Sequence, residues 1–179
     1  TTASGNVAIG NQSLRENTTG STNTAVGSSS GQSITTGDEN VTIGHGALDG
    51  GTTVNGNTAV GTDTMGSASY SGSYNTAVGY NAMLVATSVS GTTAIGNQAL
   101  DALTTGDNNT AVGAGALGAC TTGTNNTALG VFALSTATTA TDNTAIGQDA
   151  LTAVTTGSRN VAVGEDAGKN VTTGQENVL

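Results

Sequence analysis

The sequence predicts an all-β fold: a β-solenoid (a β-roll or β-prism) of about ten stacked 17-residue coils, with two short strands in each coil. Three observations lead to this prediction: a fixed period along the whole chain, a β-branched segment closed by glycine in each repeat, and a composition with 28 glycines and no proline. A fixed period of this length is typical of stacked-repeat architectures, in which each unit is stable only against its neighbours.

The repeat unit reads NTAVG, two variable residues, AL, three variable residues, TTG and two more variable residues. Every spacing is 17 residues except the 18 between Asn57 and Asn75, and Thr92 takes the place of one asparagine. We therefore expect a single repeat domain over residues 1–179. Its repeats start at Asn6, Asn23, Asn40, Asn57, Asn75, Thr92, Asn109, Asn126, Asn143, Asn160 and Asn177.

The first five residues of each unit predict a strand followed by a turn, because they are β-branched at the second and fourth positions and end in glycine. Side chains alternate across a strand, so these two positions share a face and the intervening alanine points the other way. The second position holds Thr or Val, which indicates a site that is half-buried, or buried with the threonine hydroxyl bonded locally. The fourth position is always aliphatic, and this regularity predicts that it forms the core. Its residues are Ile9, Val26, Ile43, Val60, Val78, Ile95, Val112, Leu129, Ile146 and Val163.

The second half of the unit, from Ala-Leu to Thr-Thr-Gly, predicts a second apolar anchor and a second strand. Only nine residues separate the glycines at the fifth and fifteenth positions, which is too few for an isolated helix. Gly31 and Gly168 leave the leucine position empty, so we expect looser packing in their coils.

Stacked coils would place equivalent asparagines above one another, where their amides can bond along the axis as in cross-β stacks. The recurring glycines would supply a positive φ or room for close backbone approach. The expected structural ladder includes Asn109, Asn126, Asn143, Gly113, Gly130 and Gly147.

Composition argues against several functions. The net charge is −9 with three scattered basic residues, whereas nucleic-acid binding needs clustered Lys and Arg. No apolar run is long enough for a transmembrane helix, so no membrane insertion is expected. His45 is the only histidine, and we interpret it as a solvated turn residue. We expect no enzyme activity, no catalytic residue, no metal and no cofactor.

Cys120 is the only cysteine. The simplest interpretation is a small buried hydrophobe, and an intersubunit disulfide is the alternative.

The units Asn109–Asn125 and Asn143–Arg159 resemble repeats of bacteriophage tail-fibre-like proteins and of large bacterial surface proteins. The segment Val7–Gly10 is similar to the head repeats of trimeric autotransporter adhesins, whose period is shorter. The resemblance implies a parallel homotrimer in an extracellular setting, on a virion or a bacterial cell surface. The few apolar side chains in each coil also favour association, because ordering 17 residues has a large entropic cost.

We therefore expect a structural protein: a fibre shaft or head segment, of a phage tail fibre that mediates host attachment or of a bacterial adhesin or extracellular filament. The chain starts and stops within a repeat, which suggests an excerpt of a longer fibre. The Thr-Thr pairs raise ice binding as another alternative, although adjacent threonines give only one outward rank.

Residues 62–91 form the one irregular stretch. They contain the extra residue, lack Thr-Thr-Gly and hold all three tyrosines, Tyr70, Tyr74 and Tyr80. An exposed tyrosine can contact a sugar through an apolar ring and a polar tip, so these residues are candidate contacts for a cell-surface glycan or receptor. In the alternative interpretation they cover the defect of the 18-residue coil or a trimer seam.

Overall fold

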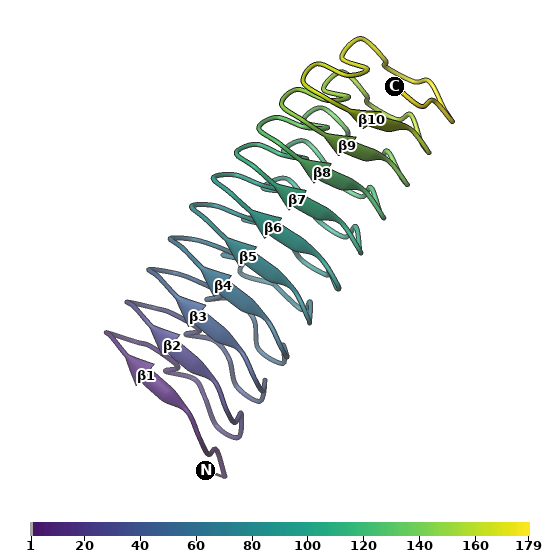
Figure 1. The fold of residues 1–179 in the computed structure, drawn as a ribbon. Helices are drawn as coiled ribbons and strands as arrows, with labels where there is room; N and C mark the ends of the chain where they lie inside the picture. The colour runs from purple at the N-terminus through teal and green to yellow at the C-terminus, as the bar shows by residue number, and fades with distance from the viewer. Residues whose placement is uncertain (1) are drawn as a thin grey trace.

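The computed structural model of the chain describes residues 2–179 as one β-solenoid (Figure 1). It contains ten strands of three residues each, all in one sheet in the order β1 to β10. The strands are β1 (Val7–Ile9), β2 (Thr24–Val26), β3 (Val41–Ile43), β4 (Thr58–Val60), β5 (Thr76–Val78), β6 (Thr93–Ile95), β7 (Thr110–Val112), β8 (Thr127–Leu129), β9 (Thr144–Ile146) and β10 (Val161–Val163).

Neighbouring strands pair in parallel with equivalent residues opposite one another, for example Ala111 with Ala128. The register persists through the 18-residue coil, where Ala59 pairs with Ala77. At an interstrand spacing of about 4.8 Å, the ten strands make a sheet roughly 45 Å long. The predicted all-β solenoid of 17-residue coils is thus confirmed.

Each coil contains one strand rather than the expected two. The second half of the coil is a run of turns, stitched to the next coil by backbone hydrogen bonds such as Leu117 N–H to Ala133 O at 3.0 Å and Thr121 N–H to Thr138 O at 2.9 Å. These bonds run along the solenoid axis, but the ninth-position residue, such as Leu117 (φ 52°), has a positive φ that bends the chain away from an extended strand.

The core is narrow, because the inward-facing residue of most strands is alanine. On the strands the third-position alanine points inward, as Ala94, Ala111 and Ala128 show by having no exposed surface. Opposite them lie the buried leucines of the ninth position, including Leu117 and Leu134. The alanine rank is small enough to let the two walls of the coil approach each other.

The prediction that the fourth-position aliphatic residues form the core is wrong. Ile43 is 40% exposed, Leu129 46% and Val163 61%, because side chains alternate along the strand and the alanine takes the inward side. These aliphatic residues form an outward-facing rank instead.

The fifth-position glycines meet two demands at once. Gly113 has a φ of 139°, which disfavours any residue with a side chain. A Cβ at Gly113 would also lie 2.4 Å from the carbonyl oxygen of Gly130 in the next coil. The close approach of successive coils therefore excludes every other residue type here.

The glycines at the ninth position do not stand beside open space, although we expected looser packing in their coils. A Cβ at Gly31 would already lie 3.1–3.2 Å from Ile34, Leu14 and Thr42. Gly168 is enclosed in the same way by Leu151 and Leu179, whose methyl carbons are 2.7 Å from that point. Neighbouring side chains fill the space of the missing leucine in both coils.

Candidate interaction surface

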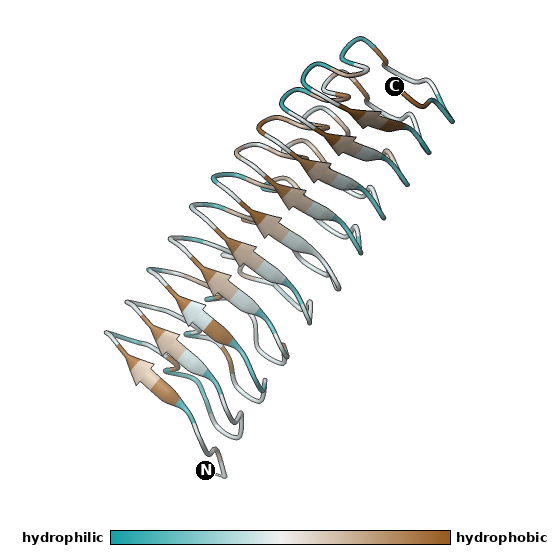
Figure 2. Cartoon of the chain, in the orientation of Figure 1, coloured by the Kyte–Doolittle hydropathy of each residue, from teal (hydrophilic) through white to brown (hydrophobic). Residues whose placement is uncertain are grey.

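The outer face of the sheet carries two parallel ranks of side chains, which together we call the strand face. The first rank is the second position of each coil, Thr or Val. It is continuous threonine over six coils: Thr58, Thr76, Thr93, Thr110, Thr127 and Thr144. The second rank is the fourth position, aliphatic in all ten strands, and Figure 2 shows it as hydrophobic colour at the tips of successive strands.

Neither rank of the strand face contains a charged residue. Most second-position side chains are half-buried, and the aliphatic rank ranges from half-buried to exposed. Soluble monomers rarely expose continuous apolar surface over such a length, and where they do it usually marks an interaction site. The strand face is therefore the strongest candidate for contact with a partner.

Beside this face the asparagines form a buried ladder. The backbone N–H of Asn126 donates to Asn109 Oδ1 at 3.0 Å, and its side-chain amide donates to the same oxygen at 3.1 Å and to the Ala140 carbonyl at 2.8 Å. Asn143 repeats the arrangement on Asn126 at 3.1 Å. The ladder joins three segments of neighbouring coils and is a structural element.

Thr92 shows what the ladder needs at minimum. Its backbone N–H donates to Asn75 Oδ1 at 2.9 Å, and its hydroxyl accepts the N–H of Asn109 at 3.2 Å. The hydroxyl keeps the bond along the axis, but within residues 2–179 it donates no hydrogen bond in place of the asparagine's amide. A hydroxyl therefore serves only part of the asparagine's role.

The two threonines of a Thr-Thr pair have different surroundings. The first threonine is half-buried in most coils, and in most of them its hydroxyl bonds the next coil, as in Thr121 to the Thr138 carbonyl at 3.1 Å and Thr138 to the Thr155 carbonyl at 3.3 Å. The second, such as Thr122, is exposed, and its hydroxyl makes no hydrogen bond within residues 2–179. Only one outward threonine rank results on this side.

The three tyrosines do not form a common surface. Tyr70 is 2% exposed, and its hydroxyl accepts a hydrogen bond from the Asn75 amide at 2.6 Å. Burial raises the pKa of this phenol. Tyr70 thus fills the core of the 18-residue coil and joins the asparagine ladder, so the expected glycan contact is wrong for this residue.

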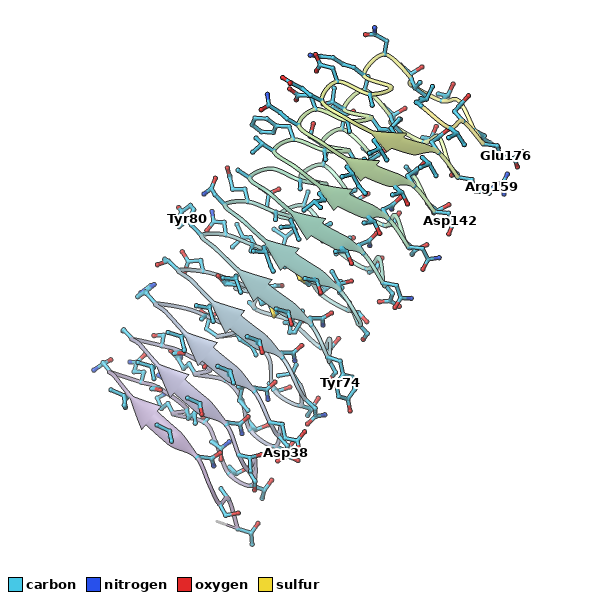
Figure 3. The ribbon with its side chains drawn as sticks, viewed as in Figure 1. Asp38, Tyr74, Tyr80, Asp142, Arg159 and Glu176 are labelled. Atoms are coloured by element: carbon cyan, nitrogen blue, oxygen red, sulfur yellow. The ribbon has the colours of Figure 1, made fainter. Side chains whose placement is uncertain are left out.

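Tyr74 and Tyr80 are exposed, but they lie at opposite edges of the solenoid (Figure 3). Tyr74 shares its edge with Asp38 and Asp142 and with Arg159, which is 3.0 Å from Glu176 (Figure 3). The Tyr74 ring also covers Gly56, where a Cβ would lie 2.7 Å from Cδ1. No single ligand of monosaccharide size could contact both tyrosines.

The groups with potential reactivity are dispersed. His45 Nδ1 lies 3.6 Å from Asp63 Oδ1, and both side chains are exposed. Cys120 is fully buried with a free thiol, as expected of a small core residue. Within residues 2–179, no three His, Cys, Asp or Glu side chains gather where they could hold a metal ion. The same part of the chain contains no helix long and apolar enough to cross a membrane.

Comparison with protein-family models, curated proteins and solved structures finds no match to this chain. The geometry of its surfaces therefore carries the functional argument.

Proposed function

We propose that this chain is a structural segment of an extracellular fibre whose copies associate through the strand face. The observation that carries the proposal is the uncharged, aliphatic rank that continues over β1–β10 without interruption. A rank repeated at one spacing along a straight sheet can meet the same rank of another copy at every coil. Such contact removes apolar area from water along the whole rod, at about 25 cal/mol per Å².

The proposed assembly is a parallel homotrimer, the number of copies that the resemblance to tail-fibre-like proteins and adhesin heads implies. We place it in a phage tail fibre that mediates host attachment, and a bacterial adhesin or extracellular filament would use the same rod. In each setting, length and lateral association are the useful properties.

Light scattering tests the association directly. The chain has a mass of 17.1 kDa, so we expect a particle of about three times that mass. Replacing Leu129, which is 46% exposed, by Glu should give monomers with an unchanged far-UV spectrum, because charge on this face opposes its burial.

The matched control is Thr122→Glu, which places the same charge on the exposed threonine side of the coil. It should leave the trimer intact. A wild-type chain that stays monomeric at high concentration, or equal dissociation by both variants, would contradict the proposal.

A second candidate function is ice binding, and a specific observation favours it. The threonine rank from Thr58 to Thr144 runs beside the aliphatic rank on one sheet, so hydroxyls and methyl groups alternate in a regular two-rank array. This array lies on the strands and not at the Thr-Thr pairs, where most of the first-threonine hydroxyls bond the next coil. Ice shaping by a monomeric wild-type chain, lost in Thr110→Lys, would support this function in place of the fibre.

A further inference from the structure

The irregular coil creates a depression on a wall of the solenoid other than the strand face. It has a volume of about 190 Å³ and is lined by Gln32, Ser33, Asp49, Gly50, Gly66 and Ala68, which come from three successive coils. We call it the coil pocket. Its volume suits one monosaccharide ring.

The extra residue explains why the pocket lies here. Tyr70 occupies the core, and the preceding segment, 66–69, is a loop that is half-buried at its start and exposed at Ala68 and Ser69. The loop comes so close to the previous coil that a Cβ at Gly50 would lie 2.0 Å from the Ser67 carbonyl oxygen. The pocket opens beside this contact, where the lining residues Gly50, Gly66 and Ala68 have little or no side chain.

The same irregularity leaves backbone donors unused. In a regular coil the N–H groups of Leu103, Thr104 and Thr105 all donate to carbonyl groups. Within the described chain, none of the N–H groups of residues 49–54 donates a hydrogen bond to another residue. The irregularity accounts for the unused N–H groups of Gly51, Thr52 and Thr53, which correspond to Leu103, Thr104 and Thr105. The N–H of Gly50, which lines the pocket, is unused as well, like that of Ala153 at the same position of a regular coil, and it needs water or a ligand as its acceptor.

The polar side chains of the pocket are also unused. Asp49, Gln32 and Ser33 make no side-chain hydrogen bond to another residue within residues 2–179. Together they offer a carboxylate acceptor, an amide that donates and accepts, and a hydroxyl. A few convergent polar groups of this kind are typical of small-ligand sites.

The charge of the pocket favours a neutral ligand over an anionic one. No basic residue lines it, and Arg15, two coils from Asp49, pairs with Glu16 at 2.7 Å. Partial burial raises the pKa of Asp49, and the nearby charge of Asp63 adds to the shift, with a smaller opposing effect of His45. An anionic sugar would be repelled, whereas neutral hydroxyls can donate to the carboxylate and accept from Gly50.

We propose that the coil pocket binds a neutral monosaccharide unit, with Asp49 accepting hydrogen bonds from sugar hydroxyls and the Gly50 N–H donating one. This site adds ligand recognition to the proposed structural role and does not depend on association through the strand face. It also differs from the tyrosine contacts expected from the sequence.

The test is a titration of the isotope-labelled chain with methyl glycosides of neutral hexoses, followed by amide NMR. We expect saturable shifts at Ser33, Gly50 and Gly51, with dissociation constants of about 1 mM, as suits one small polar ligand. Asp49→Asn should weaken binding about tenfold, because a hydrogen bond to a charged group is lost. Gln32→Ala is a second variant that keeps the carboxylate.

Asp101→Asn is the matched control, because Asp101 occupies the same coil position as Asp49 and is likewise half-buried, but lies in a regular coil. It should bind the sugars as the wild type does. Absence of saturable shifts with every hexoside, or binding unchanged in both Asp49→Asn and Gln32→Ala, would overturn the proposal. So would a response of these amides to calcium chloride alone, which would identify a cation site.

Discussion

At the scale of single residues, Cys120 shows how burial in the coil interior changes the ionisation of a side chain. Cys120 occupies a core position that holds other apolar side chains in neighbouring coils, among them Leu103, Ala137 and Val154. Burial raises the pKa of its thiol from the ordinary 9.0 to about 11, against a weaker opposite effect of a backbone hydrogen bond with Gly123. This position favours the small-hydrophobe interpretation over an intersubunit disulfide.

The raised pKa predicts a pH-dependent stability. Between about pH 9 and about pH 11 the thiol ionises in the unfolded chain but not in the fold, so the thiol's contribution to stability falls as pH rises. Between about pH 8 and about pH 10, the unfolding free energy of wild type should therefore fall by roughly 1.4 kcal/mol more than that of Cys120→Val.

Urea unfolding at the two pH values measures the difference. Tyr70 and every other titrating group are present in both proteins, so their effects cancel in the comparison. An identical fall in the two proteins would show that the thiol ionises as easily in the fold as outside it.

At the scale of structural elements, the asparagine ladder holds the coils in register. Asn126→Ala removes a carbonyl acceptor for two donors of Asn143 and an amide donor for Asn109 and Ala140. It leaves the buried N–H of Asn143 without this acceptor. We expect a loss of about 3 kcal/mol or more in unfolding free energy, from several buried groups at about 1 kcal/mol or more each.

Asn126→Thr is the comparison that isolates the bond along the axis. Thr92 already supports the next asparagine through its hydroxyl, so the threonine variant should lose about half as much stability as the alanine variant. Chemical denaturation of both variants measures the order. Equal losses would mean that the side-chain hydroxyl cannot replace the amide oxygen at this position.

The strands show what the sequence could and could not predict. Alternation established that the second and fourth positions share a face and that the alanine faces the other way. It could not decide which face points inward, and choosing the larger side chains for the core was wrong. The decisive constraint is the space that the opposite wall leaves for the inward residue, which is alanine on most strands and Thr42 on β3, beside Gly31. That space depends on the opposite wall and cannot be read from one strand.

The second half of the coil was harder to predict for a related reason. Leu117 adopts a positive φ that its residue type does not suggest, because inter-coil bonds and burial determine its conformation. The coil pocket was missed because its signal is an unused set of backbone donors, which requires the hydrogen bonds of the neighbouring coil to be known. The 18-residue spacing was the only visible sign, and it directed attention to the tyrosines.

At the scale of the whole molecule, stability should follow the number of coils, because each strand contacts only the strands before and after it. Removing residues 109–125 deletes one complete coil and joins Asn108 to Asn126, so every remaining residue keeps its position in the repeat. We expect a folded solenoid with nine strands, shorter by about 4.8 Å. Small-angle scattering and circular dichroism measure both properties.

Removing residues 109–117 is the matched control, because it deletes about half as many residues but shifts every later coil out of phase. In that variant Ala128 could not take the place of Ala111 opposite Ala94, and the asparagine ladder would be interrupted beyond Thr92. We expect loss of cooperative unfolding in the second half of the chain, although fewer residues are missing. If the full-coil deletion were as damaging as the half-coil deletion, the solenoid would depend on contacts beyond nearest neighbours.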